Sequence, residues 1–337
     1  MTDLAQGLDM LDDCTIGFAQ LLRQDRRRPS ISVALGDVTM TELLRTPDER
    51  FHDLPGFPYD PLYIDDLRGF EGLRMHYVDE GPRNAGDIFL CLHGEPTWSY
   101  LYRKMIPVFT AAGHRVIAPD FFGFGRSDKP VQEAEYTFDF HRNALIAFIE
   151  HLNLKNITLV CQDWGGILGL TLPMSMSDRF SRLLVMNTTL GTGDVQLTKG
   201  FLDWRAWVRR NPDFSAARLV KRTCPHLSGK ESAAYDAPFP NTNYKAGLRR
   251  FPELVPDRPD APGAELSRSA RDWMRSRWTG WVFMAVGMKD PVLGPPVMEA
   301  LRGDIRGCPE PYEVVEAGHF VQEWGEGIAR RALSAFD

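Results

Sequence analysis

Short apolar runs and stretches of helical spacing alternate along the chain from about residue 73. The runs predict strands at Leu73–Val78, Ile88–Leu92, Arg115–Ala118, Ile157–Gln162, Leu183–Met186, Val282–Val286 and Tyr312–Val315. Helical spacing predicts helices at Tyr100–Phe109, Phe138–Leu154, Ile167–Met176, Pro296–Leu301 and Val321–Phe336. Strands that alternate with helices favour an α/β fold with a mostly parallel central sheet flanked by helices.

The alternation lapses between residues 188 and 262. This stretch is polar and rich in proline and aromatic residues, so we expect a helical cap here. The cap would be inserted between a first part of the α/β core, residues 40–187, and a second part, residues 263–337. Ligands of open α/β sheets bind at the carboxyl ends of the strands, so a cap at that end would enclose the site.

Residues 1–39 form an N-terminal extension without a well-defined element. Leucines occur at helical spacing and are followed by the basic run Arg26–Arg28 and a short apolar patch. A secretory signal would place positive charge before a long apolar core, which this segment does not do. The alternatives are a surface appendage, a twin-arginine export signal, or a start codon chosen too early, with Met40 as the first residue.

The composition is that of an ordinary globular protein. Hydrophobic residues make up 43% of the chain and charged residues 25%, and no run reaches the roughly 18 apolar residues of a membrane span. The net charge of −6 argues against a nucleic-acid partner, because phosphate binding requires a basic surface. The five cysteines form no CxxC pair, and Cys91 and Cys161 are expected to be buried thiols. We therefore expect a cytoplasmic protein, with the periplasm as the alternative.

The run from Cys161 to Gly165 follows an apolar strand and precedes a helix. This is the setting of a nucleophile elbow, whose usual form is Gly-x-Ser-x-Gly. Asp163 occupies the nucleophile position here, which excludes a serine esterase. A carboxylate is ionised at neutral pH and can attack without a base. The alternative is that Asp163 only caps the following helix.

An acid and a histidine follow the elbow in the expected chain order. Asp290 comes after the strand Val282–Val286, and His319 comes after the last strand. The preceding strand ends at Asn187 and offers no acid. A nucleophile, an acid and a histidine at three strand ends therefore predict a catalytic triad.

The loop after Leu92 carries the second half of an oxyanion hole. In this fold one backbone N–H comes from that loop and another from the residue after the nucleophile. These donors would be Glu95 and Trp164. His93 is more readily explained as a brace of the loop than as a base.

At these residues the chain resembles the haloalkane dehalogenases, and among them the first subfamily. The resemblance runs from about Leu44 to the C-terminus. The motifs that carry it are His93-Gly94-Glu95-Pro96-Thr97-Trp98, Ala118-Pro119-Asp120-Phe121-Phe122-Gly123-Phe124-Gly125, Gln162-Asp163-Trp164-Gly165-Gly166, Gly287-Met288-Lys289-Asp290 and Gly318-His319-Phe320-Val321-Gln322.

The resemblance implies an α/β-hydrolase fold and a role for each site residue. Asp163 would be the nucleophile, His319 the base and Asp290 its acid. Trp164 and a cap tryptophan would bind the halide, and Trp204 is preferred over its rival Trp207. The Glu95 side chain would help to position water. The expected pocket residues are Phe201, Phe121, Val255, Val292 and Leu293.

The resemblance also implies the partners. The substrate would be a halogenated alkane that reacts with water to give a primary alcohol and a halide ion. No organic cofactor and no metal site are expected, and no nucleic acid or membrane partner. We expect a monomer.

Two other functions compete with this interpretation. An epoxide hydrolase uses the same aspartate elbow with two cap tyrosines, and Tyr235 and Tyr244 lie in the cap. A haloalkane dehalogenase is favoured over an epoxide hydrolase by Gln162, Glu95 and the pair of tryptophans. A non-catalytic binding module normally loses part of the triad, whereas all three members are present here.

Overall fold

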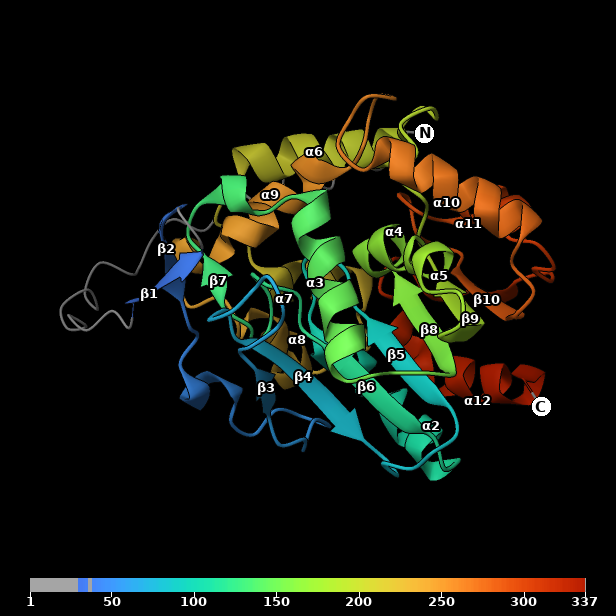
Figure 1. The fold of residues 1–337 in the computed structure, drawn as a ribbon, viewed down its shortest axis with the longest axis horizontal. Coiled ribbons are helices and arrows are strands. Elements are labelled where there is room, and N and C mark those ends of the chain that lie inside the picture. Colours follow the sequence, from blue (N-terminus) through green and yellow to red (C-terminus); the bar gives the residue numbers. More distant parts are fainter. Residues whose placement is uncertain (1–29, 36–37, 337) are drawn as a thin grey trace.

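The computed structural model describes residues 30–35 and 38–336 (Figure 1). The main sheet has the strand order β11-β10-β9-β8-β5-β6-β4-β3. Neighbours from β11 to β6 are parallel, and β4 and β3 continue the sheet antiparallel, which confirms the mostly parallel sheet. Its strands are β3 (Leu62–Ile64), β4 (Met75–Glu80), β5 (Ile88–Leu92), β6 (Arg115–Pro119), β8 (Ile157–Gln162), β9 (Phe180–Met186), β10 (Trp281–Gly287) and β11 (Tyr312–Val314).

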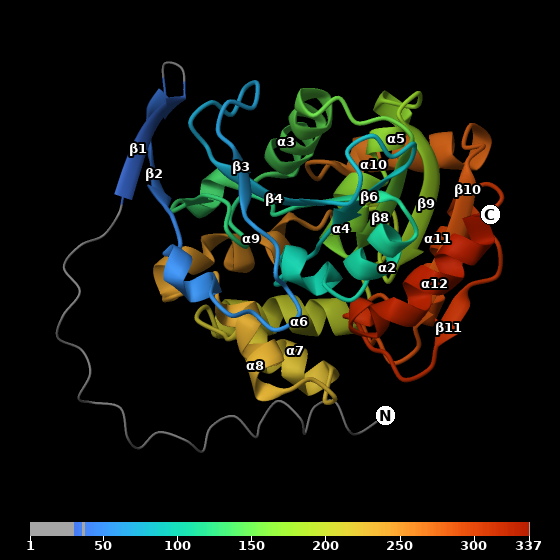
Figure 2. The same ribbon diagram turned by 90° about the horizontal axis from the view of Figure 1, so that it is seen from below.

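Helices cover both faces of this sheet. The helix α3 (Phe138–His151) lies on one face, and α2 (Ile106–Ala111) and α12 (Gly325–Phe336) lie together on the other (Figure 2). Every residue of β5 and of β8 is consequently buried, which explains their continuous apolar sequences. Within the described residues, no helix is long and apolar enough to cross a membrane.

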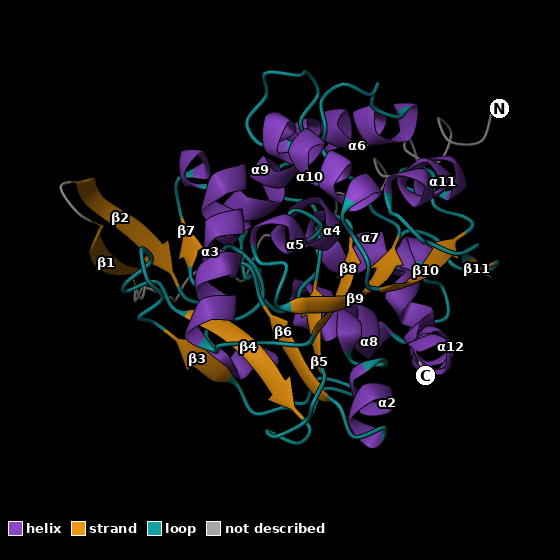
Figure 3. Cartoon of the chain, turned by 45° about the vertical axis from the view of Figure 1, so that its right-hand side comes forward, coloured by secondary structure: helices purple, strands orange, loops and turns teal. Residues whose placement is uncertain are grey.

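The chain between β9 and α10 (Ala264–Ser276) forms helices and contains no strand among its described residues. These helices are α6 (Lys199–Arg210), α7 (Ala216–Thr223), α8 (Gly229–Ala233) and α9 (Ala246–Leu254), with 3-10 turns η5 (Ala234–Asp236) and η6 (Thr242–Lys245). Serine or threonine side chains cap the first three. Helices α6 and α9 lie beyond the ends of the strands, as expected of a cap (Figure 3). The limits 188–262 remain a prediction.

A second, small sheet precedes the core. The strand β1 (Ser30–Leu35) pairs antiparallel with β2 (Val38–Leu44), and β2 pairs with β7 (Lys129–Pro130). The sequence analysis assigned no element before residue 40, so it missed this hairpin. The leucines at helical spacing and Arg26–Arg28 lie outside the described residues. The Met40 start and the export signal remain predictions.

Prolines divide two of the expected helices. The stretch Tyr100–Phe109 becomes η3 (Ser99–Tyr102) and α2, and the stretch Ile167–Met176 is covered by α4 (Trp164–Gly169) and α5 (Leu172–Ser175). Pro107 and Pro173 stand in the first turns of α2 and α5, where a missing N–H costs nothing and a new helix can begin. The helix α10 was missed, and α11 (Pro295–Asp304) and the 3-10 turn η7 (Val321–Trp324) complete the core.

Candidate active site

Asp163 occupies a strained turn between β8 and α4. Its φ of 50° and ψ of −126° lie outside the regions that L-residues favour. The turn brings the start of α4 very close to the end of β5 and to the residues after β9. A Cβ at position 165 would lie 1.9 Å from the carbonyl oxygen of Leu92, and one at position 166 would lie 2.1 Å from Oγ1 of Thr188. Glycine is therefore required at both positions.

The carboxylate of Asp163 is held by the loop after β5. It accepts no capping hydrogen bond from α4, so the helix-cap interpretation finds no support. Its Oδ1 instead accepts the backbone N–H of Glu95 over 2.8 Å. Gly94 makes this approach possible, because a Cβ there would lie 2.3 Å from the same oxygen. Trp164 begins α4, where the first N–H groups have no partner inside the helix.

His319 connects the second oxygen of this carboxylate to Asp290. Its Nε2 lies 3.6 Å from Oδ2 of Asp163, and its Nδ1 lies 2.9 Å from Oδ2 of Asp290. Burial lowers the pKa of His319, but the negative charges of Asp290 and Asp163 outweigh it and raise the pKa to about 10. The three residues predicted to form a triad are therefore brought together in the expected arrangement.

Asp290 is buried and fully hydrogen-bonded. Besides His319, its carboxylate accepts the backbone N–H of Val292 over 2.8 Å and the side-chain amide of Asn187 over 3.0 Å. Burial alone would raise the pKa of Asp290, but the charge of His319 and these hydrogen bonds hold it below the usual value. The group is thus kept ionised.

Asn187 is a site residue that the sequence analysis missed. It was considered only as a position without an acid. Its amide contacts both Asp290 and the carbonyl oxygen of Gly287 at 3.2 Å, and its Oδ1 accepts the N–H of Gly287 over 2.7 Å. The signal was its place at the carboxyl end of β9, beside the strand that leads to Asp290.

The Glu95 side chain is buried next to the nucleophile. Burial and the negative charge of Asp163 raise the pKa of Glu95 well above its usual value, although His319 and a hydrogen bond with Trp204 oppose the shift. Its Oε1 has no hydrogen-bond partner among the described residues. Burial and the neighbouring charge of Asp163 therefore disfavour the ionised form of this carboxyl.

The two tryptophans reach this site from the core and from the cap. Trp164 is buried, and its ring lies 4.8 Å from that of Phe251 in α9. Trp204 lies on α6, near enough to the Glu95 carboxyl to lower its pKa, and its ring stacks on that of Trp207 at 5.4 Å. The contact with Glu95 places Trp204 next to the nucleophile, which supports the preference for Trp204 over Trp207.

The predicted pocket residues come from three parts of the chain. Phe121 is buried, and its ring lies 4.3 Å from that of His93. Phe201 lies on α6 and Val255 follows α9, whereas Val292 and Leu293 follow Asp290. Their roles remain predictions. Phe251, which packs against Trp164, is an additional aromatic neighbour that the sequence analysis did not select.

His93 has the contacts of a brace. Its Nε2 accepts the backbone N–H of Phe121 over 2.9 Å, so the proton lies on Nδ1, which donates to the carbonyl oxygen of Gly94 over 2.9 Å. These bonds connect the loop after β6 to the loop after β5, whose Glu95 N–H donates to Asp163. The thiols of Cys91 and Cys161 are buried and free, as predicted.

The cap tyrosines are placed differently from the tryptophans. The hydroxyl of Tyr235 donates to the carboxylate of Glu323 and accepts from Arg103 over 3.3 Å. Tyr244 is buried in η6. Tyr235 is thus committed to a buried ion pair.

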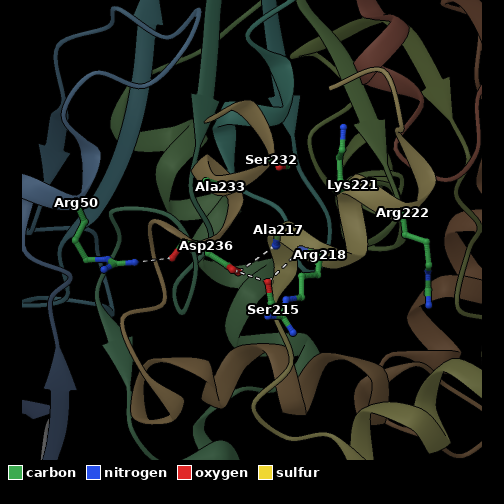
Figure 4. A pocket seen from close by; sticks show the side chains of 9 residues that line it. All are labelled: Arg50, Ser215, Ala217, Arg218, Lys221, Arg222, Ser232, Ala233 and Asp236. Atoms are coloured by element: carbon green, nitrogen blue, oxygen red, sulfur yellow. Dashed lines mark hydrogen bonds between the residues drawn. The ribbon is translucent and has the colours of Figure 1, made fainter. Parts of the chain in front are cut away.

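A separate hollow of about 660 Å³ lies at α7 and α8, and none of the candidate site residues lines it (Figure 4). Arg50 borders it and donates to the carbonyl oxygens of Ala237 and Asp236. Lys221 and Arg222 point in different directions. The positive charges around this hollow therefore do not converge on one point.

Comparisons with known proteins point to one family. Residues 87–326 match the family model described as the alpha/beta hydrolase fold. The haloalkane dehalogenase of Psychrobacter cryohalolentis is 46% identical over 296 residues, which cover 86% of this chain and 96% of that protein. Haloalkane dehalogenase 1 of Mycobacterium tuberculosis is 44% identical over 299 residues, which cover 87% of this chain and 98% of that protein.

Solved structures agree with these relatives. The haloalkane dehalogenase DpaA from Paraglaciecola agarilytica, described as tetrameric, superposes with a TM-score of 0.86 at 55% identity. The match covers 87% of this chain and 98% of that one.

Proposed function

The chain belongs to the haloalkane dehalogenase family of the α/β-hydrolase fold, and from this premise we propose that it hydrolyses halogenated alkanes through an alkyl ester of Asp163. The overall reaction converts an alkyl halide and water into a primary alcohol, a halide ion and a proton. One observation carries the proposal. Glu95 N–H holds one oxygen of Asp163, while the other oxygen lies 3.6 Å from His319 Nε2.

In the first step, Oδ2 of Asp163 attacks the carbon that bears the halogen. The new C–O bond forms as the carbon–halogen bond breaks, and the halide leaves with the electron pair. No proton is needed, because a halide is stable as an anion. Indole N–H groups suit this leaving group, since they donate a hydrogen bond and do not ionise. Trp164 and Trp204 are the proposed donors.

In the second step, His319 removes a proton from water, and the resulting hydroxide attacks the carbonyl carbon of the ester. The negative charge develops on Oδ1, where the N–H of Glu95 already donates over 2.8 Å. Collapse breaks the bond between the carbonyl carbon and the alkoxide oxygen. The alkoxide takes the proton from His319 and leaves as the alcohol, and the carboxylic acid left at Asp163 releases its proton to solvent, which regenerates the carboxylate.

The epoxide hydrolase alternative requires tyrosine hydroxyls that protonate an alkoxide. The hydroxyl of Tyr235 is committed to Glu323 and Arg103, so it is not available for this role. The non-catalytic alternative requires a damaged triad, whereas Asp163, His319 and Asp290 are all present and in contact.

Halide release from 1-bromobutane, set against diol formation from styrene oxide, tests the proposed function. We expect halide from the wild type and none from Asp163→Ala. Asp203→Ala, an exposed cap variant whose partner is Lys199, is the matched control and should retain activity. Diol without halide would favour the epoxide hydrolase, and halide release by Asp163→Ala would refute the nucleophile.

The remaining properties of the proposed enzyme are expectations. A monomer and a cytoplasmic location remain predictions, and the relative DpaA is described as tetrameric. Light scattering of the purified protein would decide between a monomer and a tetramer.

A further inference from the structure

Gln162 stands directly before the nucleophile and contacts the base. It is the last residue of β8 and is fully buried. Its side-chain nitrogen lies 3.1 Å from the backbone carbonyl oxygen of His319 and 3.0 Å from ring Nε2 of the same residue. Its Oε1 accepts from the amide of Gln322 over 3.4 Å.

The carbonyl oxygen of His319 fixes the orientation of the Gln162 amide. A carbonyl oxygen can only accept a hydrogen bond, so the amide edge that faces it must be the NH2 group. A flipped amide would bring two acceptor oxygens together in a buried place, which is costly. The second N–H of the group is then the one nearest to Nε2 of His319. Nε2 can accept this N–H only while it carries no proton.

Four groups therefore act on the protonation of His319. The carboxylates of Asp290 and Asp163 favour the positively charged ring, as does Glu95 in its ionised form. Gln162 acts in the opposite direction, because its donor is satisfied by the neutral ring and repelled by a protonated Nε2. Esterification removes the charge of Asp163. The balance then shifts toward the neutral ring, which is the form that can accept a proton from water.

We propose that Gln162 is a positioning residue that keeps Nε2 of His319 an unprotonated acceptor during hydrolysis of the alkyl ester. This inference rests on the proposed function. The amide of Gln162 neither gains nor loses a proton. When water donates its proton to Nε2, the hydrogen bond from Gln162 is released, and it forms again once the alkoxide has taken that proton.

Single-turnover measurements with 1-bromobutane test this role. Halide release reports the first step, and mass spectrometry of quenched samples follows the decay of the ester at each pH. In Gln162→Met, which keeps the length of the side chain and removes the amide, we expect halide release within about twofold of wild type. The rate of ester hydrolysis should fall at low pH as His319 becomes protonated, and this acid limb of the pH–rate profile should lie about half to one pH unit higher than in wild type. The reason is that the variant loses one hydrogen bond to the neutral ring of His319, which raises the pKa of that ring.

Gln162→Glu keeps the shape and replaces the donor by a carboxylate. It should move the same limb upward by about two units, because a neighbouring negative charge favours the protonated ring. If Gln162→Met does not fold, this isosteric variant carries the test. Gln322→Met is the matched control: it disturbs the same buried cluster, leaves both donors of Gln162 in place, and should leave the limb where it is in wild type.

The possible results distinguish a failure of the role of Gln162 from a failure of the proposed function. An ester that forms normally in the Gln162 variants but decays more slowly with an unmoved acid limb would overturn the positioning role, since a merely structural defect slows the step at every pH. An equal shift in Gln322→Met would overturn it as well. A wild type that forms no ester and releases no halide would refute the proposed function itself, and the role of Gln162 with it.

Discussion

The backbone N–H of Glu95 donates to Oδ1 of Asp163 over 2.8 Å. This bond distinguishes the two oxygens of the nucleophile. Oδ1 is held by the loop after β5, and Oδ2 faces His319 at 3.6 Å. In the proposed mechanism, attack through Oδ2 leaves Oδ1 as the carbonyl oxygen of the ester, so the donor that orients the first step would also stabilise the charge of the second. No reorganisation is required between the two steps.

The division of labour between Asp163 and His319 predicts a trapped intermediate. His319→Gln removes the proposed base but leaves the proposed nucleophile, so we expect one equivalent of halide in a burst and then no turnover. Intact-protein mass spectrometry should show the chain heavier by the alkyl group. His151→Gln, on the partly exposed end of α3, should turn over like wild type. Steady turnover by His319→Gln would remove His319 from the role of base.

The contact between Trp204 and Glu95 predicts which cap tryptophan binds the halide. Trp204→Phe keeps an aromatic ring and removes the N–H, so kcat/KM for a bromoalkane should fall by about 100-fold, as when one donor of an oxyanion hole is lost. Trp207→Phe removes the same group from the stacked neighbour and should change kcat/KM by no more than about threefold. Equal losses, or a larger loss in Trp207→Phe, would reverse the assignment. Quenching of tryptophan fluorescence by bromide should be weaker in Trp204→Phe than in wild type.

The hydrogen bond between Asp290 and His319 predicts a pH effect. The carboxylates of Asp290 and Asp163 together outweigh burial and raise the pKa of His319 to about 10 in the free enzyme. Asp290→Asn removes one of these charges, so the pKa of His319 should fall, and its ring should lose its proton at lower pH than in wild type. NMR titration of the histidine rings measures this directly. His93, whose pKa is lowered by burial, should titrate as in wild type. An unchanged or higher pKa of His319 would contradict the arrangement.

The triad could be predicted from the sequence because each member follows an apolar strand. Parallel strands carry their carboxyl ends to one edge, so the order Asp163, Asp290, His319 sufficed to place three distant segments together. The elbow was also marked by Gly165 and Gly166, whose lack of a side chain allows α4 to lie close to Leu92 at the end of β5 and to Thr188 after β9.

The site features that the sequence did not indicate are residues whose importance comes from contacts with other helices, strands and loops. Asn187 and Gln162 do not react in the proposed mechanism, and their importance comes from the hydrogen bonds they make to Asp290 and His319. The choice between Trp204 and Trp207 could not be made from helical spacing, because both lie on one helix and stack on each other. Three-dimensional neighbours such as Phe251 leave no local pattern.

The buried pair of Arg103 and Glu323 connects the core to the cap. Glu323 lies in η7, four residues after His319, and both of its oxygens accept from Arg103, over 2.7 and 2.8 Å. Arg103 also reaches Glu231 in α8 over 3.3 Å, and Tyr235 donates to Glu323. Burial would raise the pKa of Glu323, but Arg103 holds it below the usual value. The pair therefore links cap residues to the segment that follows the base.

This pair predicts a large and pH-dependent loss of stability in Glu323→Gln. Removing the charge of Glu323 leaves the buried Arg103 with only its longer contact to the partly exposed Glu231, so the free energy of unfolding in urea at pH 7 should fall by about 3 kcal/mol. Because the pKa of Glu323 is lower folded than unfolded, its contribution is present above the unfolded value near 4.5 and is lost as the pH falls through the lower folded value. The difference between variant and wild type should therefore shrink below about pH 4.5.

Glu326→Gln is the matched control for this prediction. Glu326 lies three residues further along, and its ion pair with Arg330 is exposed at both ends. An exposed pair of this kind contributes at most about 0.5 kcal/mol, so the control should unfold almost as wild type does at every pH. If Glu323→Gln and Glu326→Gln lose equal stability, the buried pair does not hold the cap to the core. If the loss in Glu323→Gln is large but independent of pH, the lost contribution is packing and not the charge of the carboxylate.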